Sequence, residues 1–132
     1  MSIGSPRRTG AGVRVAIVDS GVHAQHPHVA GVAGGVGIED GQYSEDYVDR
    51  LGHGTAVAGA IREKASAAEL FAVRIFDRHL ATNIQALVSA IDWAVDARMH
   101  VVNLSLGTAN PRHEDALTAA VARAAAAGVL IV

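Results

Sequence analysis

Short apolar runs rich in β-branched residues alternate with longer segments of helical periodicity along most of this 132-residue chain. The apolar runs, each expected to be a strand, are 13–18, 29–38, 70–76, 101–106 and 129–132. The segments expected to be helices are 54–64, 83–98 and 113–127. Such alternation is typical of a parallel sheet with helices packed on both faces. The sequence therefore predicts a doubly wound α/β fold with a mostly parallel sheet.

The helix expected over 83–98 has the clearest pattern. Its apolar stripe consists of Ile84, Leu87, Val88, Ile91 and Val95. Thr82 is the residue expected to cap its start, and Gly128 suits the position just after the following helix. The polar and acidic segment 39–52 is expected to be a loop.

Composition restricts the classes of function. Half of the residues are hydrophobic and 18% are charged, so the chain can bury a core. The net charge of −2, with no basic run longer than Arg7-Arg8, argues against binding to nucleic acid or to an anionic membrane. Cysteine is absent, which excludes disulfides and thiol chemistry. No apolar stretch is long enough for a membrane span or a signal peptide. The sequence as given is therefore expected to be cytoplasmic, and it leaves the localisation of the whole protein unknown.

Two polar residues lie where the function of such a sheet is expected, outside the carboxyl ends of its strands. Asp19 ends the first apolar run, and a carboxylate there could orient a histidine or simply cap a turn. His53 stands between two glycines at the start of an expected helix, where the glycines permit a close approach of neighbouring backbone. Taken alone, each residue has a structural explanation as good as the catalytic one.

Three motifs taken together are much more specific. They are Asp-Ser-Gly-Val at 19–22, Gly-His-Gly-Thr-Ala-Val-Ala-Gly at 52–59 and Val-Val-Asn-Leu-Ser-Leu-Gly at 101–107. In this order they resemble three successive signatures of the subtilisin-like serine peptidases, with the aspartate before the histidine. His26-Pro27 also resembles the His-Pro that follows the aspartate motif in that family. The resemblance extends from about Gly12 to the end of the chain.

This resemblance implies a serine endopeptidase that cleaves polypeptides. Asp19 would orient His53, and His53 would be the general base that activates a serine. Ser105, Leu106 and Gly107 would form an extended edge that pairs with the substrate backbone, as an added strand does. No cofactor would be required for this chemistry.

The catalytic serine is the main departure from the family pattern. The family places it in a Gly-Thr-Ser-x-Ala turn, and none of this chain's serines has that context: they stand at 2, 5, 20, 44, 66, 89 and 105. The family's oxyanion asparagine would follow the strand that begins at Val129, and neither Asn103 nor Asn110 matches it. Ala56 stands where many relatives have a second histidine.

The chain thus resembles a truncated, N-terminal part of a catalytic domain. We expect 1–12 to be an extension too short for an inhibitory propeptide, and 13–132 to be the domain part. Alone, the 132 residues are predicted to show no cleavage sensitive to phenylmethylsulfonyl fluoride, because the serine must come from further sequence, a second chain or self-association. Substrate preference is not fixed by these residues.

Two alternatives remain open at this stage. The chain could be a catalytically dead subtilisin-like half that serves as a binding domain, which the coding sequence beyond Val132 would distinguish from an enzyme. A receiver-like domain also ends its first strand in aspartate, but Asp19 has no acidic neighbour and the histidine motif would be unexplained. The first reading, a serine endopeptidase, accounts for all three motifs.

Metal binding has weaker support in the sequence. His23, His26 and His28 could supply three imidazoles, but no carboxylate is interleaved, so a solvated loop is the preferred interpretation. A structural calcium ion would need oxygen ligands, and the acidic loop offers Glu39, Asp40, Glu45, Asp46 and Asp49. Their spacing is not that of a regular calcium loop, so no metal site is predicted.

Overall fold

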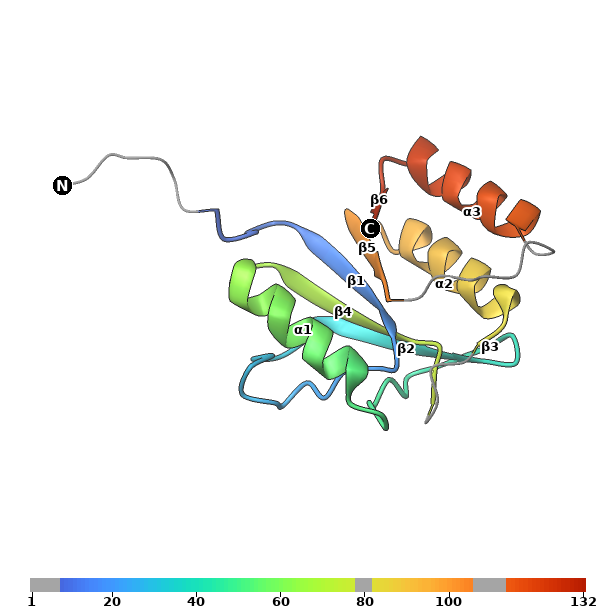
Figure 1. Cartoon of the computed structure of the whole chain (residues 1–132). Coiled ribbons are helices and arrows are strands. Elements are labelled where there is room, and N and C mark those ends of the chain that lie inside the picture. The colour runs from blue at the N-terminus through green and yellow to red at the C-terminus, as the bar shows by residue number, and fades with distance from the viewer. Residues whose placement is uncertain (1–7, 78–81, 106–113) are drawn as a thin grey trace.

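A computed structural model describes residues 8–77, 82–105 and 114–132, and Figure 1 shows their arrangement. The strands are β1 (Arg14–Asp19), β2 (Gly34–Glu39), β3 (Gln42–Ser44), β4 (Glu69–Arg74), β5 (Val101–Leu104) and β6 (Leu130–Ile131). The helices are α1 (His53–Lys64), α2 (Ile84–Asp96) and α3 (Glu114–Ala126). None of these helices is long and apolar enough to cross a membrane.

The six strands form one sheet in the order β3-β2-β4-β1-β5-β6. β1 lies between β4 and β5 and pairs with both in parallel, and the β2–β4 and β5–β6 pairs are parallel as well. Only β3 runs antiparallel to its neighbour, β2. The prediction of a mostly parallel α/β sheet is confirmed.

Successive side chains of β1 enter two separate cores, because neighbouring residues of a strand point to opposite faces of the sheet. Val15 and Ile17 join Ala58 of α1 in one core. Ala16 and Val18 join the apolar stripe of α2 and the buried alanines of α3 in the other. Figure 1 shows α1 on one side of the sheet and α2 with α3 on the other. Helices therefore cover both faces, as the sequence pattern predicted.

The expected loop over 39–52 contains a strand that the pattern missed. Ile38 of β2 pairs with Tyr43 of β3 across a tight hairpin. Asp40 and Gly41 at its tip both have positive φ, 49° and 74°, which is the geometry that an Asp-Gly turn favours. β3 is only three residues long and exposed throughout, so it has no hydrophobic alternation by which to be recognised. The Asp-Gly pair was the available signal.

Two boundaries also differ from the sequence prediction. β2 begins at Gly34, well after the expected start at residue 29. The cap of α2 is Asn83, whose side-chain oxygen accepts a hydrogen bond from the Ala86 amide at 2.8 Å, and the prediction of Thr82 is wrong. Asn and Thr are both good capping residues, so two adjacent candidates could not be separated from sequence alone.

Candidate active site

The two motif residues that the sequence singles out face each other at the carboxyl edge of the sheet. Asp19 is the last residue of β1, and His53 is the first residue of α1. The Nδ1 atom of His53 lies 3.0 Å from Oδ1 and 2.9 Å from Oδ2 of Asp19. The aspartate side chain is completely buried, whereas 42% of the histidine side chain is exposed. The imidazole is thus held by a buried carboxylate while part of the histidine side chain is open to solvent.

The hydrogen bonding assigns a tautomer to the neutral imidazole. A carboxylate can only accept, so the proton of neutral His53 belongs on Nδ1, facing Asp19. The Nε2 atom then carries the free lone pair. The backbone amide of Ser20 donates to Asp19 Oδ1 at 2.7 Å and helps to fix the carboxylate. An oriented imidazole with a free Nε2 can accept a proton from an approaching hydroxyl.

The glycine after His53 is required by a close approach of α1 to the end of β1. A Cβ atom at Gly54 would collide with the carbonyl oxygen of Gly21 and would lie 3.2 Å from the Cβ of Asp19. Gly52, which precedes the histidine, has a φ of 101°, a conformation that other residues rarely adopt. The Gly-His-Gly sequence therefore allows the helix to begin directly against Asp19.

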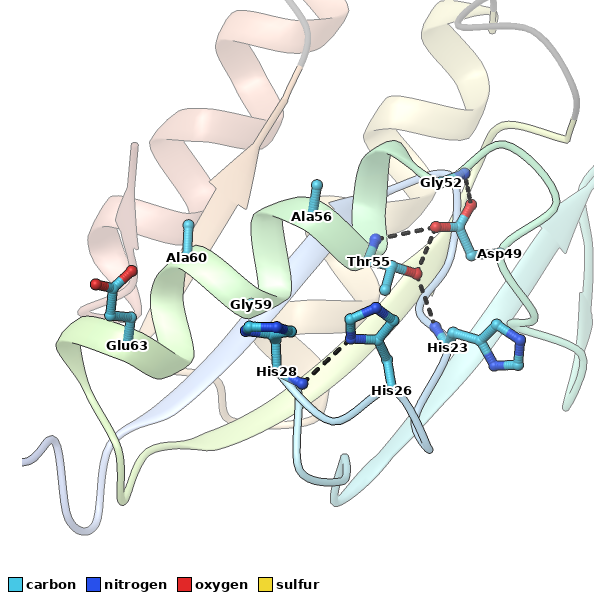
Figure 2. A pocket seen from close by; sticks show the side chains of 10 residues that line it. All are labelled: His23, His26, His28, Asp49, Gly52, Thr55, Ala56, Gly59, Ala60 and Glu63. Carbon is cyan, nitrogen blue, oxygen red and sulfur yellow. Dashed lines mark hydrogen bonds between the residues drawn. The ribbon is translucent and has the colours of Figure 1, made fainter.

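Asp49 is a functional candidate that the sequence reasoning considered only as an oxygen donor for calcium. Its Oδ1 accepts from the Ser20 hydroxyl at 2.8 Å and from the amides of Leu51 and Gly52 at 2.9 and 2.7 Å. Its Oδ2 accepts from the amide and the hydroxyl of Thr55 at 3.0 and 2.5 Å. Figure 2 shows Asp49 between Gly52 and Thr55 at the start of α1.

The ionisation of Asp49 reflects these contacts. Partial burial acts to raise the pKa of this carboxyl, but the hydrogen bonds from Thr55, Gly52 and Leu51 outweigh burial and hold the pKa below its ordinary value. The group is therefore a carboxylate at neutral pH. An aspartate placed shortly before a helix start is a common capping signal, and that signal could have identified it.

Comparison with known proteins agrees with the geometry. The model of the subtilase family (Peptidase S8) matches residues 10–132. The chain belongs to the subtilase family. It is 37% identical over 132 residues to a thermostable alkaline protease of Halalkalibacterium halodurans, covering 93% of this chain and 35% of the relative.

Other members of the subtilase family show the same partial coverage. Subtilisin E of Bacillus subtilis is 33% identical over 132 residues, which cover 93% of this chain and 34% of the relative. Subtilisin Savinase of Lederbergia lenta is 36% identical over 133 residues, which cover 94% of this chain and 47% of the relative. The chain thus spans about a third to a half of the length of these subtilases.

The third motif of this subtilase chain lies only partly within the described residues. Ser105 follows β5, and its amide contacts the Val18 carbonyl oxygen at 3.4 Å. The side-chain amide of Asn103 donates to the Ser105 hydroxyl at 3.2 Å. Because β5 pairs with β1, Ser105 lies at the same edge of the sheet as Asp19. Leu106 and Gly107 lie outside the described residues, and the substrate-binding role of all three residues remains a prediction.

The histidine-rich loop lines a pocket of about 570 Å³ beside α1, and Figure 2 shows its walls. His26 and His28 lie over the Gly59 side of the helix, with His23 near Thr55. His26 Nδ1 accepts a hydrogen bond from the His28 amide at 3.2 Å, so this ring nitrogen already has a partner. Within residues 8–77, 82–105 and 114–132, no three histidine, aspartate or glutamate side chains gather to hold a metal.

Two carboxylates of the acidic loop are bound by arginines. Glu39 accepts from the buried guanidinium of Arg74 at 2.8 Å, and Asp46 accepts from Arg50 at 2.8 Å. The hydrogen bond from Arg50, aided by the Val48 amide, holds the pKa of Asp46 below its ordinary value. With Asp49 saturated as well, three of the five carboxylates considered for calcium already have donors. These carboxylates therefore give no support for a calcium site.

Proposed function

We propose that this chain is part of a serine endopeptidase of the subtilisin type, in which Asp19 orients His53 and His53 is the general base. The observation that carries this proposal is the contact of His53 Nδ1 with both oxygens of a fully buried carboxylate, at 3.0 and 2.9 Å. Membership of the subtilase family and the similarity to a relative named as an alkaline protease support it.

The proposed reaction begins at the free nitrogen of His53. Nε2 removes the proton from a serine hydroxyl as the serine oxygen attacks the carbonyl carbon of the peptide bond. The buried charge of Asp19 stabilises the imidazolium that forms, and Nε2 then returns the proton to the leaving amine. Ser105, Leu106 and Gly107 are proposed to pair with the extended substrate backbone next to this site.

The nucleophile is proposed to lie outside these 132 residues. Within the described part of the chain, the side-chain hydrogen bonds of His53 are those from Nδ1 to Asp19. The Ser20 hydroxyl donates to Asp49 and accepts from the Gly54 amide. The Ser20 hydroxyl therefore has a structural role and is not the proposed nucleophile. A further segment or a second chain would bring the reactive serine to the exposed side of His53.

The decisive test is kinetic and uses protein that contains both this chain and the nucleophile. Asp19→Asn is expected to lower kcat about 10⁴-fold with little change in KM, because an asparagine cannot hold the reactive tautomer. Asp92→Asn is a matched control, since the exposed salt bridge of Asp92 with Arg123 joins α2 to α3, on the face of the sheet away from α1. Equal activity of Asp19→Asn and the unmodified protein would contradict the proposal.

A catalytically dead binding domain of the same fold is the alternative function. A fluorophosphonate probe distinguishes the two candidates, because it labels the serine of an active peptidase and leaves a catalytically dead binding domain unlabelled.

A further inference from the structure

We propose that Asp49 is a positioning residue for the Asp19–His53 pair: its carboxylate ties the end of β1 to the start of α1 and so sets the orientation of the imidazole. The inference rests on the proposed function, since it assigns a role in the same reaction. Asp49 does not contact the histidine ring in any hydrogen bond of the described residues, so it acts through its neighbours.

The carboxylate of Asp49 is fully used. It accepts five hydrogen bonds, two from hydroxyl groups and three from backbone amides. A carboxylate has about four lone-pair sites, so these donors saturate it and fix its orientation. Hydrogen bonds to a charged acceptor are stronger than neutral ones. The residue therefore forms a rigid junction, and no acceptor capacity is left for a ligand.

The donors come from both sides of the catalytic pair. Ser20 directly follows Asp19, whereas Gly52 and Thr55 stand on either side of His53. The Ser20 hydroxyl donates to Asp49 and in turn accepts from the Gly54 amide at 2.9 Å. The turn after Asp19 and the turn around His53 are thus joined by two links: the Ser20 hydroxyl bonds to Gly54, and it also bonds to Asp49, which bonds to Thr55. A shift of this junction would change the distance between His53 and Asp19.

The junction also supplies what the start of α1 lacks. The residue before the helix is Gly52, which has no side chain to cap the first amides. The free amides of Gly54 and Thr55 are instead satisfied by Ser20 and Asp49. A negative charge near a helix N-terminus also interacts favourably with the positive end of the helix dipole, so Asp49 stabilises the start of α1.

A purely structural role would predict a loss of stability and nothing more, so the test measures the tautomer of His53. The ¹⁵N resonances of a neutral imidazole report which ring nitrogen carries the proton. In the unmodified chain, Nδ1 is expected to carry it because Asp19 accepts there. In Asp49→Asn, where the side-chain amide would face the Thr55 donors, a fraction of the Nε2-protonated form is expected to appear.

Two further variants separate positioning from folding. Ser20→Ala removes the link from Asp49 to the β1 side while the bonds to Leu51, Gly52 and Thr55 remain, and it should also raise the Nε2-protonated fraction. Asp46→Asn is the matched control, because Asp46 lies in the same loop but pairs with Arg50. It should leave the tautomer unchanged.

The outcomes distinguish this inference from the proposed function. An unmodified chain with Nδ1 protonated, and an unchanged tautomer in folded Ser20→Ala or Asp49→Asn, would overturn the positioning role alone. An unmodified chain that carries the proton on Nε2 would overturn both, because the Asp19–His53 pair would not exist in solution. The expected result is a larger Nε2-protonated fraction of His53 in Ser20→Ala and Asp49→Asn, and an unchanged tautomer in Asp46→Asn.

Discussion

The first amides of helix α2 are capped by the adjacent residue, whereas those of helix α1 are capped by residues outside the helix start. α2 is capped by the residue just before it, with Asn83 accepting from Ala86. α1 is preceded by a glycine, and its first amides bond to Ser20 and Asp49, of which Ser20 lies more than thirty residues away in the sequence. A local cap stabilises a helix wherever that helix lies. A cap supplied by another element also fixes where the helix begins relative to that element, and here that position carries His53.

The largest effect is expected where α1 touches β1. Gly54→Ala should destabilise the fold by about 3 kcal/mol and disrupt the Asp19–His53 contact, because the new methyl group meets the Gly21 backbone. Gly59→Ala is the control within the same helix: its Cβ would meet His28 at an ordinary 3.4 Å, so stability should rise by about 0.5–1 kcal/mol. Urea unfolding measures both, and an equally stable Gly54→Ala would contradict the close approach.

A smaller effect is expected at the local cap. Asn83→Ala should cost about 1 kcal/mol of unfolding free energy, because the Ala86 amide loses its acceptor. Thr82→Ala should have little effect, since the neighbouring asparagine provides the cap. In both variants the ¹⁵N spectrum of His53 should be unchanged. A shifted His53 tautomer in Asn83→Ala would show that the two helix starts are coupled.

The smallest effect concerns pH. Because the folded pKa of Asp49 is below its ordinary value, its ionisation stabilises the fold above about pH 4, and this contribution is lost as the pH falls through the folded pKa. The unfolding free energy of the unmodified chain should therefore fall on acidification. Asp49→Asn should make that fall shallower, whereas Asn83→Ala should leave its slope unchanged. The unfolding free energy of the unmodified chain, Asp49→Asn and Asn83→Ala is measured as a function of pH. An identical pH dependence in Asp49→Asn and the unmodified chain would contradict the lowered pKa of Asp49.

The elements with regular burial were predictable from sequence, and those without it were not. β1 and α2 repeat apolar residues with the periods of a strand and of a helix, and both were located within about two residues. β3 is short and exposed, so only its Asp-Gly turn marked it. Asp19 and His53 were identified by their motifs. Asp49 was assigned to an acidic loop, because its donors at Ser20 and Thr55 meet only in the folded chain.

The sequence by itself determined the kind of fold, since alternating apolar strands and amphipathic helices can bury their faces only as a layered α/β sheet. It also indicated Asp19 and His53 as the candidate site residues, because the motifs at 19–22, 52–59 and 101–107 occur in the order of the subtilisin-like peptidases. Only the tertiary structure decided the distance between Asp19 and His53 and how it is maintained. That distance depends on a glycine packed against a carbonyl group and on one carboxylate shared by two turns, and contacts between residues so far apart in sequence have no periodic signature along the chain.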